Sequence, residues 1–106
     1  MLDNIANMRK FYVYILASKK DGVLYTGFTG NLASRLEAHK KHLNEGFTEK
    51  YCVTKLVYLE QFDKANEAIM REKQIKHWKR EWRISLIEGQ NPEWEDLTTK
   101  KNFAIL

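Results

Sequence analysis

Two short runs of aromatic and β-branched residues, separated by an Asp-Gly turn signal, constrain the fold of this chain most strongly. The first run covers residues 11–17 and the second covers residues 23–29. Each has the length and composition of a strand, and Asp21-Gly22 is a preferred turn sequence between paired strands. The pattern predicts a β-hairpin with both faces covered, because the first run is apolar or aromatic on each face.

The position of the turn decides which side chains of the hairpin face one another. If the loop is residues 18–21, Ala17 pairs with Gly22, and Tyr14 lies directly opposite Tyr25. The two phenols then share one face, and a slip of one residue would separate them. Cross-strand packing is the common reason for such a pair, although a buried tyrosine still needs a partner for its hydroxyl.

The rest of the chain predicts three helices and one further strand. The helices are expected over residues 32–43, 64–78 and 81–88, and the strand over residues 54–62. Asn31 and Asp63 are suited to cap the first two helices, and Gly89 is suited to end the third. The order ββαβαα predicts an α+β fold, with a small antiparallel or mixed three-stranded sheet covered by helices.

Length and composition indicate one domain with a modest core. The chain has 106 residues, of which 43% are hydrophobic. We expect an N-terminal extension over residues 1–10, a domain over residues 11–94 and a C-terminal tail over residues 95–106. No apolar run approaches the roughly 18 residues of a membrane span, and the N-terminus lacks the apolar region of a secretory signal. A single cysteine, Cys52, excludes an internal disulfide. The default expectation is therefore a cytoplasmic protein without a membrane partner.

The charge balance weakly favours a polyanionic partner. Lys and Arg number 18 against 14 Asp and Glu, which leaves a net charge of +4. Three basic residues between the last turn of the second predicted helix and the start of the third form a candidate nucleic-acid-binding face. They are Lys76, Lys79 and Arg80. A merely solvated helix face is the common alternative.

Glu72 does not fit a plain apolar core. The second predicted helix has an apolar stripe, and Glu72 falls in its middle. The stripe consists of Ala65, Ala68, Ile69 and Ile75. A buried carboxylate is costly unless a cation meets it, and a metal ion or a fixed basic side chain would serve. Pairing with a lysine, or reaching solvent at the edge of the stripe, is an equally good interpretation.

These residues together resemble the GIY-YIG nuclease superfamily, most closely its small stand-alone members. Residues 12–14 (Tyr-Val-Tyr) and 25–27 (Tyr-Thr-Gly) match its two signatures. Residues 31–39, with Arg35 and His39, resemble its helix, and residues 70–76 resemble the segment that carries its glutamate. Tyr12 and Thr26 depart from the family's glycine and isoleucine.

The resemblance implies hydrolysis of phosphodiester bonds with one divalent metal. Glu72 would hold Mg²⁺ or Mn²⁺, weakly when no substrate is bound. Tyr25 would act as, or help to activate, the general base, and Tyr14 would orient water or phosphate. Arg35 would stabilise charge on the phosphate, and His39 would assist the leaving group or the phosphate.

Three functions remain open at this point. The favoured one is a metal-dependent endonuclease of DNA or RNA, with DNA as the expected substrate. A domain of this size leaves little room for sequence reading, so a separate targeting protein is a further expected partner. The alternatives are a non-catalytic nucleic-acid-binding module on the same scaffold and a protein-interaction domain with an incidental basic surface.

Overall fold

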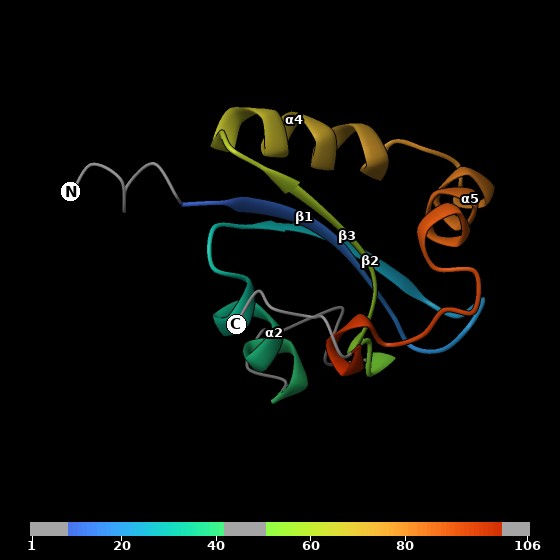
Figure 1. The fold of residues 1–106 in the computed structure, drawn as a ribbon. Helices are drawn as coiled ribbons and strands as arrows, with labels where there is room; N and C mark the ends of the chain where they lie inside the picture. Colours follow the sequence, from blue (N-terminus) through green and yellow to red (C-terminus); the bar gives the residue numbers. More distant parts are fainter. Residues whose placement is uncertain (1–8, 42–50, 101–106) are drawn as a thin grey trace.

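The computed structural model describes residues 9–41 and 51–100, and within them the fold is α+β (Figure 1). A three-stranded antiparallel sheet has the strand order β2-β1-β3. The strands are β1 (Phe11–Ala17), β2 (Leu24–Thr29) and β3 (Lys55–Phe62). The helices are α2 (Leu32–Lys40), α4 (Ala65–Lys76) and α5 (Arg80–Gln90), followed by a short 3₁₀ helix, η1 (Leu97–Thr99). The predicted fold class and element order are confirmed.

The central strand β1 is covered on both faces, as its composition predicts. Six of its seven residues are buried. Val13 and Ile15 pack in a cluster with Ala68 and Ile75 of α4, whereas Tyr14 and its same-face neighbours pack with α2. Figure 1 shows α4 and α2 on opposite sides of the sheet. Because side chains alternate along a strand, each face of β1 supports a different layer.

The predicted hairpin register is wrong by two residues. Tyr14 pairs with Gly27 and Leu16 pairs with Tyr25, so the loop is six residues long, over residues 18–23. Ser18 closes this loop, because its backbone N–H donates to Val23 O and its hydroxyl accepts from Val23 N, both at 3.0 Å. Side-chain direction in a strand alternates with a period of two residues. A register shift of two residues therefore leaves Tyr14 and Tyr25 on the same face, now diagonal to each other.

The helix ends differ from the predicted ones where long-range contacts intervene. Asn31 caps α2 as predicted, accepting from Ser34 N at 3.1 Å, whereas residues 42–43 of the predicted helix lie outside the described residues. Asp63 does not cap α4, because its carboxylate pairs with Lys10. None of the helices in the described ranges is both long and apolar enough to cross a bilayer.

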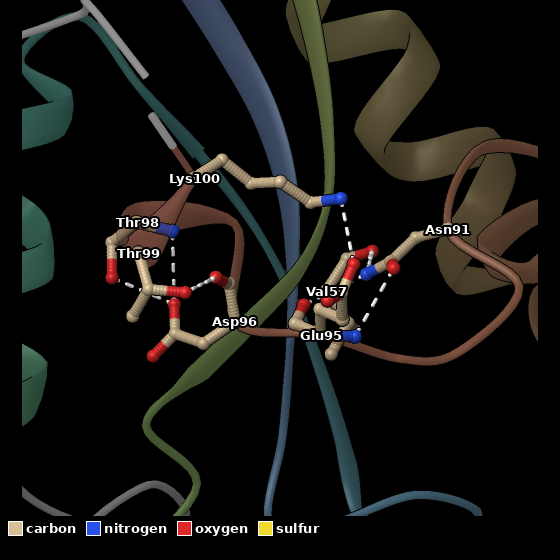
Figure 2. Close-up of polar contacts among 7 residues, drawn as sticks. All are labelled: Val57, Asn91, Glu95, Asp96, Thr98, Thr99 and Lys100. Carbon is tan, nitrogen blue, oxygen red and sulfur yellow. Dashed lines mark hydrogen bonds and ion pairs between the residues drawn. The ribbon is translucent and has the colours of Figure 1, made fainter. Parts of the chain in front are cut away.

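The third helix passes through Gly89 and ends at Gln90, with Asn91 as its C-cap. The Asn91 side-chain amide donates to Val57 O at 3.0 Å and to Glu95 O at 2.8 Å, and its oxygen accepts from Glu95 N (Figure 2). The next turn buries Trp94 completely, and its indole N–H donates to Glu88 at 2.8 Å. These bonds hold the segment after α5 against β3.

Ordered contacts continue from Trp94 to Lys100. Asp96 caps η1 by accepting from the backbone N–H and the hydroxyl of Thr98, and Lys100 forms an ion pair with Glu95 (Figure 2). Leu97 packs against the sheet face that carries Tyr14. The η1 segment therefore helps to cover the same face as α2.

Candidate active site

Three aromatic rings from three different elements meet on the α2 side of the sheet. The Tyr14 hydroxyl and His39 Nε2 are 3.0 Å apart, and both side chains are buried. The Tyr25 ring centroid lies 5.2 Å from that of His39 and 6.3 Å from that of Tyr14. Strands β1 and β2 and helix α2 thus bring together three predicted site residues. The sequence places His39 at the edge of the α2 stripe, but the structure leaves only 1% of it exposed.

Gly27 makes room for the Tyr14 phenol. A Cβ atom at position 27 would lie 2.4 Å from the Tyr14 hydroxyl oxygen and 2.5 Å from its Cζ. Because β2 is an edge strand and Gly27 pairs with Tyr14, the phenol extends over β2 toward the edge of the sheet. Gly27 is not among the site residues predicted from the sequence. A glycine inside a strand is nevertheless a sequence signal of close approach.

Burial and three neighbouring side chains act on the pKa of the Tyr14 phenol. Burial raises its pKa well above the usual range, and the neighbouring Tyr25 and, more weakly, the Glu72 carboxylate raise it further. The nearby Arg35 guanidinium partly offsets this rise. Tyr14 therefore keeps its proton at neutral pH. It can donate a hydrogen bond, but it is unsuited to act as a base.

His39 is held in its neutral form. Burial lowers its pKa, and the positive charge of Arg35 lowers it further. If the protonated Tyr14 donates to Nε2, the imidazole proton lies on Nδ1. That nitrogen is buried and finds no acceptor in the described part of the chain. A water molecule or a substrate oxygen is the natural partner for it.

The lowered pKa of His39 makes stability dependent on pH. Below about pH 7 the unfolded chain takes up a proton at its ordinary pKa of 6.5, whereas the folded chain resists protonation until its lower pKa is reached. The free energy of unfolding should therefore fall as the pH is lowered through this window. Urea denaturation between pH 5 and 8 measures this slope. The variant His39→Gln should flatten it, whereas His77→Gln, which changes an exposed histidine, should leave it in place. Equal slopes for wild type and His39→Gln would contradict the assignment.

Glu72 approaches from α4, on the other side of the sheet. Its side chain is 16% exposed and forms an ion pair with Lys76 at 2.8 Å, one of the two interpretations open from sequence. The predicted stripe is wrong at Ile69, which is exposed, so the buried line of α4 runs through Ala68 and Ile75. Glu72 accordingly flanks this line instead of lying in its middle.

The direction of Glu72 follows from its neighbour. Arg71 flanks the buried line on the opposite side and donates from Nε to Glu60 of β3 at 2.9 Å. Since β3 and β2 are the two edges of the sheet, Glu72 is directed toward the β2 edge. This is the edge over which the Tyr14 phenol extends. The effect of Glu72 on the pKa of Tyr14 agrees with this placement.

The donor set suits a metal held mainly by its substrate. No group of three or more His, Cys, Asp or Glu side chains within residues 9–41 and 51–100 could enclose a metal ion. Glu72 supplies one partly buried carboxylate at the β2 edge. Mg²⁺ is commonly bound by one or two carboxylates, with waters and substrate phosphates supplying the remaining ligands. Glu72 therefore fits one protein ligand of such an ion.

The three predicted nucleic-acid-binding residues have different surroundings. Lys76 pairs with Glu72, and Lys79 is exposed at the start of α5. Arg80 is also exposed, but its Nη2 donates to Asp21 O at 2.7 Å and to Gly22 O at 2.6 Å. Arg80 thereby holds α5 against the hairpin loop.

Comparison with known proteins assigns the chain to a class. Residues 10–85 match the model of the GIY-YIG catalytic domain, a nuclease-type domain whose substrates are nucleic acids. The chain belongs to the GIY-YIG family.

The similar proteins are small single-domain members of this family. A UPF0213 protein of Staphylococcus haemolyticus is 41% identical over 85 residues, covering 76% of this chain and 98% of the relative. A UPF0213 protein of Clostridium perfringens is 38% identical over 92 residues, covering 87% of this chain and 98% of the relative. The solution NMR structure of a UPF0213 protein from Bacillus halodurans is 30% identical, with a TM-score of 0.54. That match covers 90% of this chain and 99% of that one.

Proposed function

We propose that the protein is a metal-dependent endonuclease that hydrolyses phosphodiester bonds of DNA or RNA, with DNA as the expected substrate. One observation carries this proposal. The buried Tyr14 phenol of β1 lies 3.0 Å from His39 of α2, and the Tyr25 ring of β2 lies beside both side chains. Arg35 and Glu72 are near enough to shift the pKa of this phenol. Metal-assisted phosphoryl transfer uses a base, a cation that binds phosphate and a ligand for the metal, and a phenol, a guanidinium and a carboxylate can supply these.

The two tyrosines have different parts in this proposal. Tyr14 is fully buried and keeps its proton, so it acts as a hydrogen-bond donor that positions water or phosphate. Tyr25 is only partly buried, so it is the phenol that substrate and water can reach. We assign to Tyr25 the activation of the attacking water. His39, neutral and bonded to Tyr14, positions the pair and assists the phosphate or the leaving group.

We assign to Arg35 and Glu72 the stabilisation of negative charge on the scissile phosphate. The planar guanidinium of Arg35 can donate two parallel hydrogen bonds to phosphate oxygens. Glu72 would hold Mg²⁺ or Mn²⁺, and the bound ion supplies Lewis-acid stabilisation of the developing negative charge. In the structure Lys76 pairs with Glu72 Oε2, so a metal ion would compete with this lysine for the carboxylate. We therefore expect weak metal binding when no substrate is present, and the released Lys76 can then contact phosphate.

The experiment that tests this function combines metal dependence with one substitution. Wild-type protein should cut DNA, or RNA, in Mg²⁺ or Mn²⁺ and should stop cutting in excess chelator. Glu72→Gln should lower the cleavage rate by at least about a hundredfold, because it removes the metal's charged ligand while keeping the size of the side chain. Glu67→Gln is the matched control, since Glu67 is exposed on the same helix.

Other outcomes of this experiment would overturn the proposal. Nucleic-acid binding without cleavage in either metal would favour a binding module on this scaffold. Absence of both binding and cleavage would favour a protein-interaction domain. Cleavage unaffected by Glu72→Gln would leave the nuclease activity but remove the assigned metal ligand.

A further inference from the structure

A cleft beside the hairpin loop contains two arginines that the proposed active site does not use. Its volume is about 490 Å³, and its described lining consists of Val23, Leu24, Tyr51, Arg80 and Arg83. It lies between the beginning of β2 and the first turn of α5. The cleft therefore continues the β2 edge, from Tyr25 toward the hairpin loop.

Arg80 is held at the rim of this cleft by the hairpin loop. Its Nη2 donates to two backbone oxygens, of Asp21 and Gly22. These acceptors are neutral carbonyls, so the positive charge of Arg80 is not compensated by a carboxylate there. Because this guanidinium is already held in place, the Arg80 side chain loses less conformational entropy when an anion binds.

The Nε–H group of Arg83 finds no acceptor in the described part of the chain. Its Nε is buried and has no hydrogen-bond partner among residues 9–41 and 51–100, and no carboxylate in those ranges pairs with it. Arg71 is the instructive contrast, since its Nε donates to Glu60 and its Nη1 to Gln74. A buried donor that is left unpaired costs free energy, which an acceptor arriving from outside would recover. The charge of Arg83 favours an anionic acceptor.

We propose that this cleft binds a phosphate of the substrate strand, one or two nucleotides from the cleaved bond, an inference that rests on the proposed function. Guanidinium groups match phosphate by paired hydrogen bonds. Val23 precedes Tyr25 by two residues, roughly 7 Å along an extended strand. Successive phosphates of one B-DNA strand rise by about 3.4 Å, so a strand lying along the β2 edge reaches the cleft within about two nucleotides.

The test is a binding titration without cleavage. A fluorescently labelled DNA duplex with a single-stranded tail is titrated with protein in chelator, at several salt concentrations. Arg83→Gln should weaken binding roughly tenfold and should reduce the slope of log affinity against log salt by about 0.7–0.9, the loss of one phosphate contact. Lys73→Gln is the control of equal charge change, since Lys73 is exposed on α4.

The outcomes separate this inference from the proposed function. If wild-type protein cuts and binds DNA, and Arg83→Gln behaves like Lys73→Gln, only the phosphate subsite is overturned. If wild-type protein neither binds nor cuts, the proposed function fails and the subsite with it. Binding that is weakened by Arg83→Gln, in a protein that does not cut, would support the subsite and reject the nuclease.

A second readout needs no substitution and covers the case in which Arg83→Gln fails to fold. The ¹⁵N NMR signal of the Arg83 Nε–H group in wild-type protein should shift when the same DNA is added, because the donor gains an acceptor. The Nε–H signal of Arg71, already bonded to Glu60, serves as the internal control and should stay in place. An unmoved Arg83 signal at saturating DNA would overturn the inference.

Discussion

Replacement of Arg35 by alanine is expected to lower the cleavage rate by about 10²–10³-fold while leaving the protein folded. This magnitude is typical for the loss of one group that stabilises charge in a transition state. Arg35 is only partly exposed at the α2 end of the site, and its charge acts on both Tyr14 and His39. Arg35→Lys should restore only part of the activity, because lysine keeps the charge and loses the planar fork.

A second measurement on the Arg35 variant does not depend on cleavage. Arg35 lowers the pKa of His39, so its removal should raise that pKa, which an NMR titration of the imidazole reports. Lys40→Ala is the matched control, since it removes one positive charge from an exposed position of the same helix. An unchanged His39 pKa in Arg35→Ala would show that the guanidinium does not lie near this ring.

Replacement of Gly27 by alanine is expected to destabilise the protein by about 1–3 kcal/mol and to reduce cleavage strongly. The added methyl would lie 2.4 Å from the Tyr14 hydroxyl oxygen, far inside contact distance. Tyr14 is fully buried, so its ring cannot move aside without breaking the hydrogen bond to His39 or displacing core neighbours. Chemical denaturation measures the first effect and the metal-dependent cleavage assay the second.

Gly89→Ala is the matched control for this substitution. Gly89 lies inside α5, and nothing is found within 4 Å of an added Cβ. Alanine favours a helix interior over glycine by about 0.5–1 kcal/mol, so this variant should be more stable than wild type and equally active. If Gly27→Ala matched Gly89→Ala in stability and activity, the close approach of Tyr14 to β2 would be refuted.

Most of the fold could be predicted from the sequence because its signals are local. Strand composition, the Asp21-Gly22 turn and the Asn31 cap act over a few residues, and the structure confirms the hairpin, the helix cap and the order ββαβαα. Local signals also failed where a distant residue competed. Asp63 is predicted to cap α4 but pairs with Lys10, and Gly89 is predicted to end α5, which instead continues to the Asn91 contact with Val57.

The sequence by itself determined which chemical groups the chain carries and on which elements they lie: Tyr14, Tyr25, Arg35, His39 and Glu72. The tertiary structure alone decided how these groups meet. The six-residue loop sets the register that places Tyr14 over Gly27, and the packing of α4 across the sheet directs Glu72 to the β2 edge. Periodicity along one element predicts which face a side chain occupies. Which other helix or strand packs against that face depends on contacts between elements. The pattern of a single element carries no information about those contacts.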